Sequence, residues 1–434
     1  MESLHGGGFH ARVIRRIPAT LLALLAAGAS LAQIGPSTPR ARGQRTPRSG
    51  EGFRADLFGS PIEIAARDRR TVLAWEGGAD LSPDADDYET VPFGSLYLWH
   101  HPDDRRLLRA SLAGVGNELF FASTGPDGSE WLASFESFTL PWATGELLDG
   151  DVLEPAKRKW GYVRPGLGIG YRTRMPPFEQ DNLFASDILV EPGLLWFGRG
   201  DETARSYVLP DSTFELRVRW QTRYDALVRN LLELPHEGFA MGLDAVAGRR
   251  LDASAYALPS GGLESGHRRY VQATAYAFLI GPVPWVDSDR HRILGSVHVG
   301  AGRGLDAFSA VRVGGGPDLR GEEFATTSRP WLPGSAWGEF FPDHYAMFSA
   351  GYRAELTFFA FLDAGATLAF LDRDRAVAGG FERRDGWLSA LSVRLSSGFL
   401  WSTRIQIGYA HGFDAIRNGR RGADEVVFAV TGRF

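Results

Sequence analysis

Three short stretches hold residue types that could do chemistry, and each lacks the context that the chemistry needs. Gly166-Leu-Gly168-Ile-Gly170 has the glycine spacing of a dinucleotide-binding loop, but it lies in a strand-like run and no helix follows it. His100-His101-Pro102-Asp103-Asp104 offers metal-ligand side chains beside a proline turn, where a solvated loop is the simpler interpretation. Asp287-Ser-Asp289-Arg-His291 is a similarly weak metal motif. None of the three predicts a site.

Composition removes further classes of function. The 434 residues include no Cys, which excludes thiolate nucleophiles, iron–sulfur ligands and zinc–cysteine sites. No G-x-S-x-G occurs, and no Gly-Lys pair exists to build a P-loop. With 47 basic and 52 acidic residues the formal net charge is −5, so charge gives no support for a nucleic-acid partner. We therefore expect a protein that is not an enzyme and that needs no cofactor and no metal.

The first 32 residues have the pattern of an export signal. Arg12, Arg15 and Arg16 precede the apolar run 17–29, and Ser30-Leu31-Ala32 offers the small residues that a signal peptidase reads. The run is short for a spanning helix, although an uncleaved anchor stays as the alternative, and nowhere else do about 18 apolar residues follow one another. We expect residues 1–32 to be a signal peptide and residues 33–52, rich in Pro, Gly and Arg, to be a disordered tether.

From Arg69 onward hydrophobic residues recur with a period of two. In residues 344–356, Phe348 and Tyr352 share one face with four other apolar side chains, while Arg353 and Glu355 lie on the other. Residues 388–397 and 401–411 alternate in the same way. One-sided alternation over about ten residues fits a strand with lipid outside and a polar lumen inside. A soluble sandwich has a similar apolar face, but long strands with aromatic ends and charged inner faces favour a barrel.

We count fifteen such strands after residue 70, taking Arg105–Ser123 as one strand. An even number returns both ends of a barrel to the periplasm, so we expect sixteen. The missing strand is expected in Leu251–Leu258 or in Phe53–Ile64. The predicted fold class is all-β: an antiparallel transmembrane β-barrel of residues 53–434, in the outer membrane of a bacterial cell.

The region from residue 310 onward carries the most specific motif. Val313-Gly-Gly-Gly-Pro-Asp-Leu-Arg320-Gly321-Glu-Glu-Phe324 resembles the G-G-x4-R-G-[FY] element of the BamA/TamA superfamily of outer-membrane insertases and translocases, also called bacterial surface antigens. Glu322 replaces the family's aromatic residue, and Phe324 stands two positions later. Phe358–Gly365 resembles the family's F-v-D-a-G strand, and five strands follow the motif, as in the family. Relatives typically carry periplasmic POTRA domains before the barrel, but here at most about 35 residues separate the expected cleavage site from the first strand, and none shows a helical period. We therefore expect a barrel-only member of the family.

The resemblance also implies a long loop that folds into the lumen. Its motif residues there would be Gly314, Gly315, Arg320, Gly321 and Phe324. A charged side chain facing lipid costs a few kcal/mol, so we place Asp363 on the inward face, together with Gly365. We expect Arg320 to pair with Asp363, and Gly365 to leave room for the loop. The alternative is a solvated Arg320, with Asp363 paired to a wall cation such as Arg394 or Arg404.

The last strand resembles the C-terminal targeting signal of bacterial outer-membrane barrels. It alternates apolar residues and glycine on one face and ends on an aromatic residue: Val426, Phe428, Val430, Gly432 and Phe434. We expect these residues to act as the barrel's assembly signal.

Taken together, these features predict a monomeric barrel in outer-membrane lipid that inserts or translocates other polypeptides. The physical basis would be a weak seam between the first and last strands, where an open edge can pair with an incoming strand. Gly77-Gly78 would weaken that seam. Three alternatives stay open: a passive pore for small solutes, an outer-membrane enzyme such as a phospholipase, and a structural or surface-interaction barrel.

Overall fold

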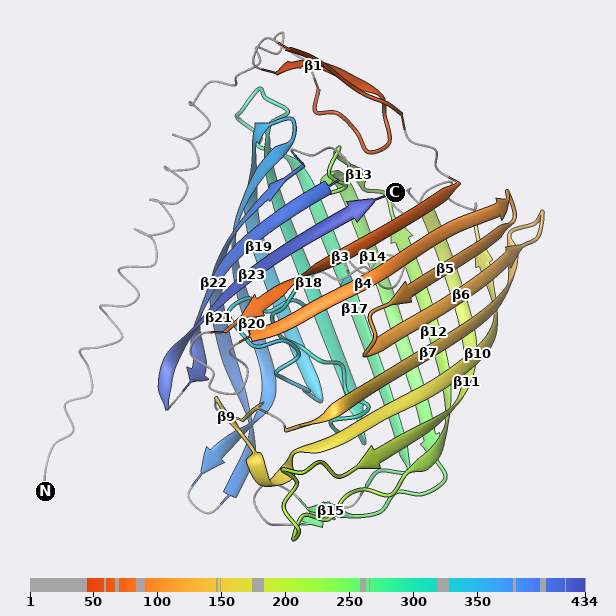
Figure 1. The fold of residues 1–434 in the computed structure, drawn as a ribbon, viewed down its shortest axis with the longest axis vertical. Coiled ribbons are helices and arrows are strands. Elements are labelled where there is room, and N and C mark those ends of the chain that lie inside the picture. Colours follow the sequence, from red (N-terminus) through yellow and green to blue (C-terminus); the bar gives the residue numbers. More distant parts are fainter. Residues whose placement is uncertain are drawn as a thin grey trace, which may run out of the picture.

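The computed structural model of the chain describes residues 45–57, 60–66, 70–82, 90–145, 147–148, 150–173, 183–257, 263–264, 266–317, 328–377, 380–398, 403–417 and 419–433. These residues form a closed antiparallel β-barrel (Figure 1). Among them, no helix is both long enough and apolar enough to span a membrane. The closed antiparallel sheet confirms the predicted all-β barrel.

Sixteen long strands of the described residues form the wall in chain order, and the last pairs with the first. They are β3 (Thr71–Leu81), β4 (Thr90–Asp103), β5 (Arg106–Leu112), β6 (Gly116–Thr124), β7 (Ser129–Thr144), β10 (Arg158–Arg172), β11 (Leu183–Gly198), β12 (Thr213–Asp225), β14 (Pro235–Arg250), β17 (Arg269–Pro282), β18 (His291–Arg303), β19 (His344–Thr357), β20 (Ala360–Val377), β21 (Gly380–Ser397), β22 (Thr403–Arg417) and β23 (Arg420–Arg433).

The remaining short elements add little to the wall. The two-residue β13 (Val228–Arg229) extends the edge of β14. The others are β1 (Phe53–Leu57) paired with β2 (Ser60–Ile64), β8 (Leu147–Leu148) with β9 (Asp151–Val152), β15 (Tyr256–Ala257) with β16 (Leu263–Glu264), and the 3-10 turn η1 (Glu154–Ala156).

The position expected for the sixteenth strand is wrong. Phe53–Ile64 forms the separate hairpin β1–β2, and the described part of Leu251–Leu258 contributes only β15, which is outside the wall. The missing strand comes from Arg105–Ser123, which folds as β5 and β6 around a turn at Ala113–Val115. Gly114 adopts a φ of 77° there, and the Asn117 amide bonds both its N–H and its carbonyl at 3.2 Å. The turn lacks the proline and aspartate of connections such as residues 101–104 and 125–128, so the sequence pattern hides it.

Side chains alternate between the lumen and the outside, as the period of two predicts. On β20, Phe361 and Thr367 are buried toward the lumen, whereas Leu368 is 43% exposed on the outer surface. Asp363 has the inward parity of Phe361 and Thr367, in agreement with the sequence. Many large hydrophobic side chains are exposed on the outer surface, including Trp131 and Leu167. This pattern is the one expected of a wall that faces lipid.

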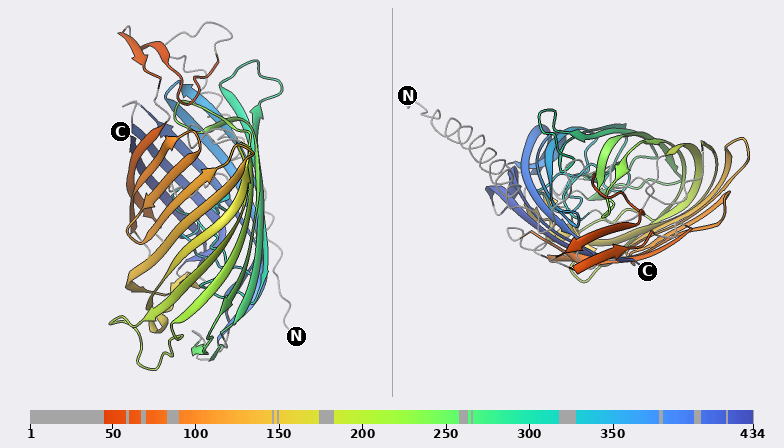
Figure 2. Two further views of the ribbon diagram at one scale, coloured as in Figure 1. Left: turned by 90° about the vertical axis from the view of Figure 1, so that its right-hand side faces the viewer. Right: turned by 90° about the horizontal axis from the view of Figure 1, so that it is seen from above.

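The two ends of the barrel differ. β3 starts and β23 ends at one rim, called here the terminal rim (upper end in Figure 1). The β1–β2 hairpin and β13 lie at that rim, while β9 and β15 lie at the opposite rim. The described residues of the connection between β18 and β19, 304–317 and 328–343, leave the wall at the opposite rim and run inside the barrel (Figure 2).

Residues 45–52 differ from the disordered tether that we expected over residues 33–52. Thr46 is 2% exposed, its Oγ1 donates to Glu355 Oε2 at 2.5 Å, and its N–H donates to Asp289 Oδ2 at 2.6 Å. Ser49 N–H donates to the Arg229 carbonyl at 2.9 Å. Carboxylates on the terminal rim thus give this polar segment partners that its composition does not reveal. Residues 1–44, with the expected signal peptide, lie outside the described residues.

Candidate functional site

The connection between β18 and β19 fills part of the lumen, as predicted. Val313 and Leu332 are almost fully buried against the inward side chains of β19 and β20, including Met347. On the far side of the lumen, Trp337 packs edge-on against Phe93 of β4. Contacts with opposite walls place the connection, called here the lumen loop, inside the barrel (Figure 2). Residues 318–327 of this loop lie outside the described residues.

Glu425 of β23 is the main anchor of the lumen loop. Its side chain faces inward and is 1% exposed. One oxygen accepts the N–H of Gly316 at 2.5 Å, and the other accepts the N–H of Gly334 at 2.7 Å. These donors lie on the two halves of the loop, on either side of residues 318–327. The carboxylate therefore clamps both halves of the loop to the last strand of the barrel.

The predicted Gly314-Gly315 pair lies at this clamp, and its glycines fit tight backbone packing. A Cβ on Gly315 would lie 2.1 Å from the Ser335 carbonyl oxygen and 2.4 Å from Glu425 Oε1. A Cβ on Gly314 would lie 2.5 Å from the Ala336 carbonyl oxygen. Side chains at either position would push the loop halves apart or displace the Glu425 carboxylate.

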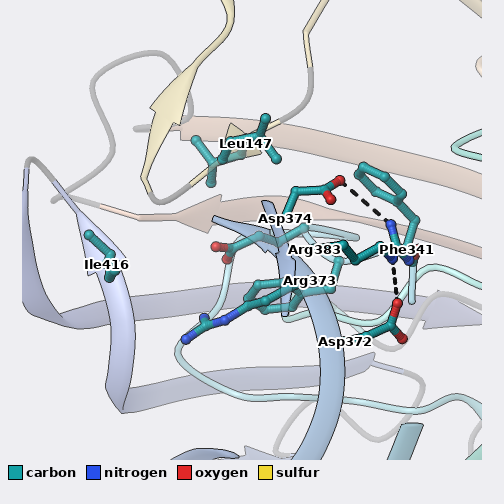
Figure 3. Close-up of a pocket in the computed structure, with 10 residues that line it drawn as sticks. Leu147, Phe341, Asp372, Arg373, Asp374, Arg383 and Ile416 are labelled. Carbon is teal, nitrogen blue, oxygen red and sulfur yellow. Dashed lines mark hydrogen bonds and ion pairs between the residues drawn. The ribbon is translucent and has the colours of Figure 1, made fainter. Parts of the chain in front are cut away.

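A second anchor joins the loop to β22. Arg417 donates to both oxygens of Glu339, at 2.9 and 2.6 Å, and both side chains are at most 3% exposed. Where the loop meets β19, Arg383 bonds the Phe341 carbonyl at 3.0 Å and pairs with Asp372 (Figure 3). The C-terminal half of the loop is thus held to β20, β21 and β22.

Part of the predicted motif lies outside the described residues: Arg320, Gly321 and Phe324. Asp363, the expected partner of Arg320, is held by Arg353 of the adjacent strand, with Nε 2.5 Å and Nη2 3.1 Å from its two oxygens. This partner is a wall cation, as in the alternative, but a different one from those named there. The pairing of Arg320 with Asp363 stays a prediction.

The lumen loop contacts the wall residue that lies across from Asp363 in the β20–β21 register. Arg394 is the register partner of Asp363 on β21, and its guanidinium lies 4.5 Å from the ring centre of Trp331 in the loop. We expected Gly365 to leave room for the loop. The three atoms nearest to a Cβ built on Gly365 instead belong to wall residues, namely Ala350, Gly351 and Ser392.

The seam between β3 and β23 is closed in the structure. The strands pair in register from Val426 opposite Leu81 to Arg433 opposite Ala74. A Cβ on Gly78 would lie 1.9 Å from the Phe428 carbonyl oxygen, and one on Gly432 would lie 2.3 Å from the Trp75 indole nitrogen. Glycines therefore permit a close approach at two points of the seam.

The outer face of β23 has the alternation that the sequence predicts. Phe428 is 42% exposed, and Val426 and Val430 are half-buried on the same face. Phe434 lies outside the described residues.

A cavity of about 1100 Å³ occupies the lumen beside the loop. Its wall side carries Arg164, Arg217 and Arg219, and these guanidinium groups are paired with carboxylates of the barrel. The shortest N–O distances are 3.1 Å from Arg164 to Glu215, 3.3 Å from Arg217 to Glu191 and 2.9 Å from Arg219 to Glu136. Within the described residues, no group of three or more His, Asp or Glu side chains could hold a metal ion.

Sequence reasoning missed the anchors Glu425, Glu339 and Arg417. One signal was available for Glu425: it is a carboxylate on the inward face of a last strand whose other inward residues include Ala429 and Thr431. A charge at such a position needs a partner from the lumen. For Glu339 and Arg417, 78 residues apart, no local signal exists.

No family model and no curated protein matches the chain. Solved structures do. BamA from Haemophilus ducreyi lacking POTRA domains 1–3 superposes with a TM-score of 0.51 at 11% identity, covering 90% of this chain and 76% of that chain. The chain has a BamA-like barrel fold. CdiB from Acinetobacter baumannii superposes with a TM-score of 0.50 at 9% identity, covering 86% of this chain and 61% of that chain. This chain thus spans about three fifths of CdiB, and at such identities the likeness concerns the BamA-like fold alone.

Proposed function

We propose that this chain is a bacterial outer-membrane barrel that inserts or translocates other polypeptides, using the seam between β3 and β23. The observation that carries the proposal is the clamp of Glu425, because it joins the lumen loop to the strand that closes the barrel. The BamA-like fold supports the same class of function. Its partners would be outer-membrane lipid and client polypeptides, with the barrel itself a monomer and not an enzyme.

The seam offers what an incoming strand needs. When β3 and β23 separate, each exposes a row of backbone N–H and C=O groups, which cost free energy in lipid until a strand pairs with them. A client strand can satisfy them by adding to the edge. Gly77, which lies opposite Val430, contributes no side chain to the packing that holds the two edges together.

The lumen loop would control the seam through Glu425. If the loop moves away, Gly316 and Gly334 no longer donate to this carboxylate, which is left buried without those bonds. An unpaired buried charge is strongly unfavourable, so β23 would have to shift or rotate. The position of the loop and the state of the last strand are thereby coupled.

Depletion of the protein tests this proposal. We expect other outer-membrane proteins to fall in abundance when this chain is depleted. Normal levels of all other outer-membrane proteins and of exported proteins, measured by quantitative proteomics of the outer membrane and the medium, would contradict it.

The second candidate is a passive pore for small solutes, and the cavity of about 1100 Å³ favours it. A pore predicts ion or solute conductance set by lumen residues such as Arg217 and Arg219. Depletion would then lower uptake of a solute selectively and leave the abundance of other barrels unchanged. The same depletion experiment therefore separates the two functions.

A further inference from the structure

The barrel wall is incomplete between β4 and β7. β5 and β6, which lie between them, are the shortest of the sixteen wall strands that the structure describes. β4 pairs with β5 only from Leu96 onward, and β6 pairs with β7 only from Phe138 toward the terminal rim. Toward the opposite rim, residues 90–95 of β4 and 140–144 of β7 face one another across a notch, beyond the β5–β6 turn (Figure 1).

The lumen cavity reaches through this notch. Five consecutive residues of β4, from Thr90 to Gly94, line it. Successive residues of a strand point to opposite faces, so a cavity enclosed by an intact wall would contact alternate residues only. Ala113 and Val115 of the β5–β6 turn and Trp142 of β7 line the same cavity. In the part of the chain that the structure describes, the cavity therefore has a lateral mouth.

The lateral mouth opens beside lipid-facing side chains. Leu96 and Leu112 flank it and are 54% and 44% exposed on the outer surface. Trp142 lines the cavity and is 56% exposed. Phe138 and Leu140 continue this apolar surface along β7 into the lumen. An acyl chain that follows that surface contacts apolar side chains along its length.

The inner end of the cavity is cationic. Among the described residues that line it, the cations are Lys157, Arg164, Arg217, Arg219 and Arg312, and the one carboxylate is Asp244. The carboxylates that pair with Arg164, Arg217 and Arg219 lie outside the lining, in the wall behind. Arg217 is paired with one carboxylate, Glu191, and Arg219 with two, Glu136 and Glu191. Because a guanidinium has five N–H donors, such groups can still donate to a further anionic group.

We propose that the notch between β4 and β7 admits a single-chain anionic amphiphile of the fatty-acid class sideways from the membrane. Its carboxylate binds at Arg217 and Arg219, and its chain lies along Phe138, Leu140 and Trp142 toward the notch. The cavity is slightly larger than the usual range for small-molecule sites, roughly 300–1,000 Å³, so a long chain fits. The site goes beyond the proposed function, since it uses neither the seam nor Glu425.

Binding of radiolabelled palmitate to the purified full chain in nanodiscs of zwitterionic phospholipid tests the proposal. Hexadecanol, with the same chain length and no charge, is the headgroup control. We expect saturable palmitate binding at least about tenfold tighter than hexadecanol binding, which corresponds to roughly 1.4 kcal/mol. Equal binding of the two, or no saturable binding of palmitate, would overturn the proposal.

A blocked mouth tests the route. Gly94→Trp places a bulky ring at the notch, where a Cβ meets no atom nearer than 3.5 Å, and Thr90→Trp does so from a second position. Gly281→Trp on β17, where a Cβ meets nothing within 4 Å, is the matched control. Heat-modifiable migration on gels verifies that each variant folds. We expect the two notch variants to slow palmitate entry at least about tenfold and the control to leave it unchanged; equal entry rates in all three would overturn the lateral route.

Discussion

The Glu425 carboxylate on the last strand accepts the backbone N–H of Gly316 in the lumen loop, at 2.5 Å. The other oxygen of the same carboxylate holds Gly334 at 2.7 Å, so one side chain links the loop to the seam. These two hydrogen bonds fix the position of the loop and stabilise the register of β23.

Glu425→Gln should loosen the lumen loop. The substitution removes the negative charge and turns an NH2 group toward one of the two N–H donors, at a cost of about 1–3 kcal/mol. We expect faster cleavage of residues 328–340 by protease added to the purified barrel. Asp424→Asn is the matched control, because Asp424 is the neighbouring carboxylate and bonds Tyr409 and His411 instead of the loop. Equal protease sensitivity of the two variants would contradict the role of the clamp.

Gly315→Ala should have a similar effect through packing. The new Cβ would lie 2.1 Å from the Ser335 carbonyl oxygen, and relief of such overpacking costs about 1–3 kcal/mol. Gly281→Ala provides the control, since a Cβ there meets nothing within 4 Å. The temperature at which the folded band disappears on gels should fall for the first variant only. An unchanged transition for Gly315→Ala would show that the loop tolerates a side chain at this point.

Asp363 and Arg320 can be separated by two variants. Asp363→Asn breaks the bidentate bond with Arg353 and should lower the free energy of unfolding of the barrel by about 1–3 kcal/mol. Arg320→Ala leaves that bond intact, so the barrel should keep its stability while the loop becomes sensitive to protease. A loop that stays protected in Arg320→Ala would argue against the pairing of Arg320 with Asp363.

Acid should release the N-terminal end of the lumen loop. Burial raises the pKa of Asp306, but hydrogen bonds and charge from Arg250 outweigh it, and the pKa is held below its ordinary value. The stabilisation that this shift provides is therefore present above the ordinary carboxyl pKa, near 4, and is lost as the pH falls through the lowered value. Proteolysis with an acid-active protease between pH 5 and pH 2 should show the loop opening only at the acid end. Asp306→Asn should remove this pH dependence; if it persists in that variant, other carboxylates cause it.

The barrel and its lumen loop could be predicted from the sequence because both leave local or familiar patterns. Alternating hydrophobicity identifies the strands, and the Gly314-Gly315 spacing marks the loop. The β5–β6 turn could not be predicted, since its Ala-Gly-Val sequence continues an apolar run and only the backbone of Gly114 reveals the reversal. The notch depends on that turn, and so it was hidden as well.

The partner of Asp363 shows a second limit. Asp363 has wall cations on both neighbouring strands, Arg353 and Arg394, and the choice between them depends on strand register. A period of two determines which face a residue occupies but leaves its cross-strand partner undetermined. The partners of Glu425 could not be predicted from local sequence either, because its donors are backbone groups 109 and 91 residues away.

If the seam between β3 and β23 opens to act on polypeptides, a reversible covalent lock across it should stop that activity. The chain has no Cys, so Gly77→Cys with Val430→Cys introduces a single possible disulfide across the seam. Ile407→Cys with Phe428→Cys locks the other side of β23 as the control. The measurement is the rate at which newly made outer-membrane proteins assemble in cells that depend on each variant. We expect oxidation to stop the assembly of outer-membrane proteins in the seam variant alone and a reductant to restore it. Normal assembly with the seam cross-linked would show that the seam need not open.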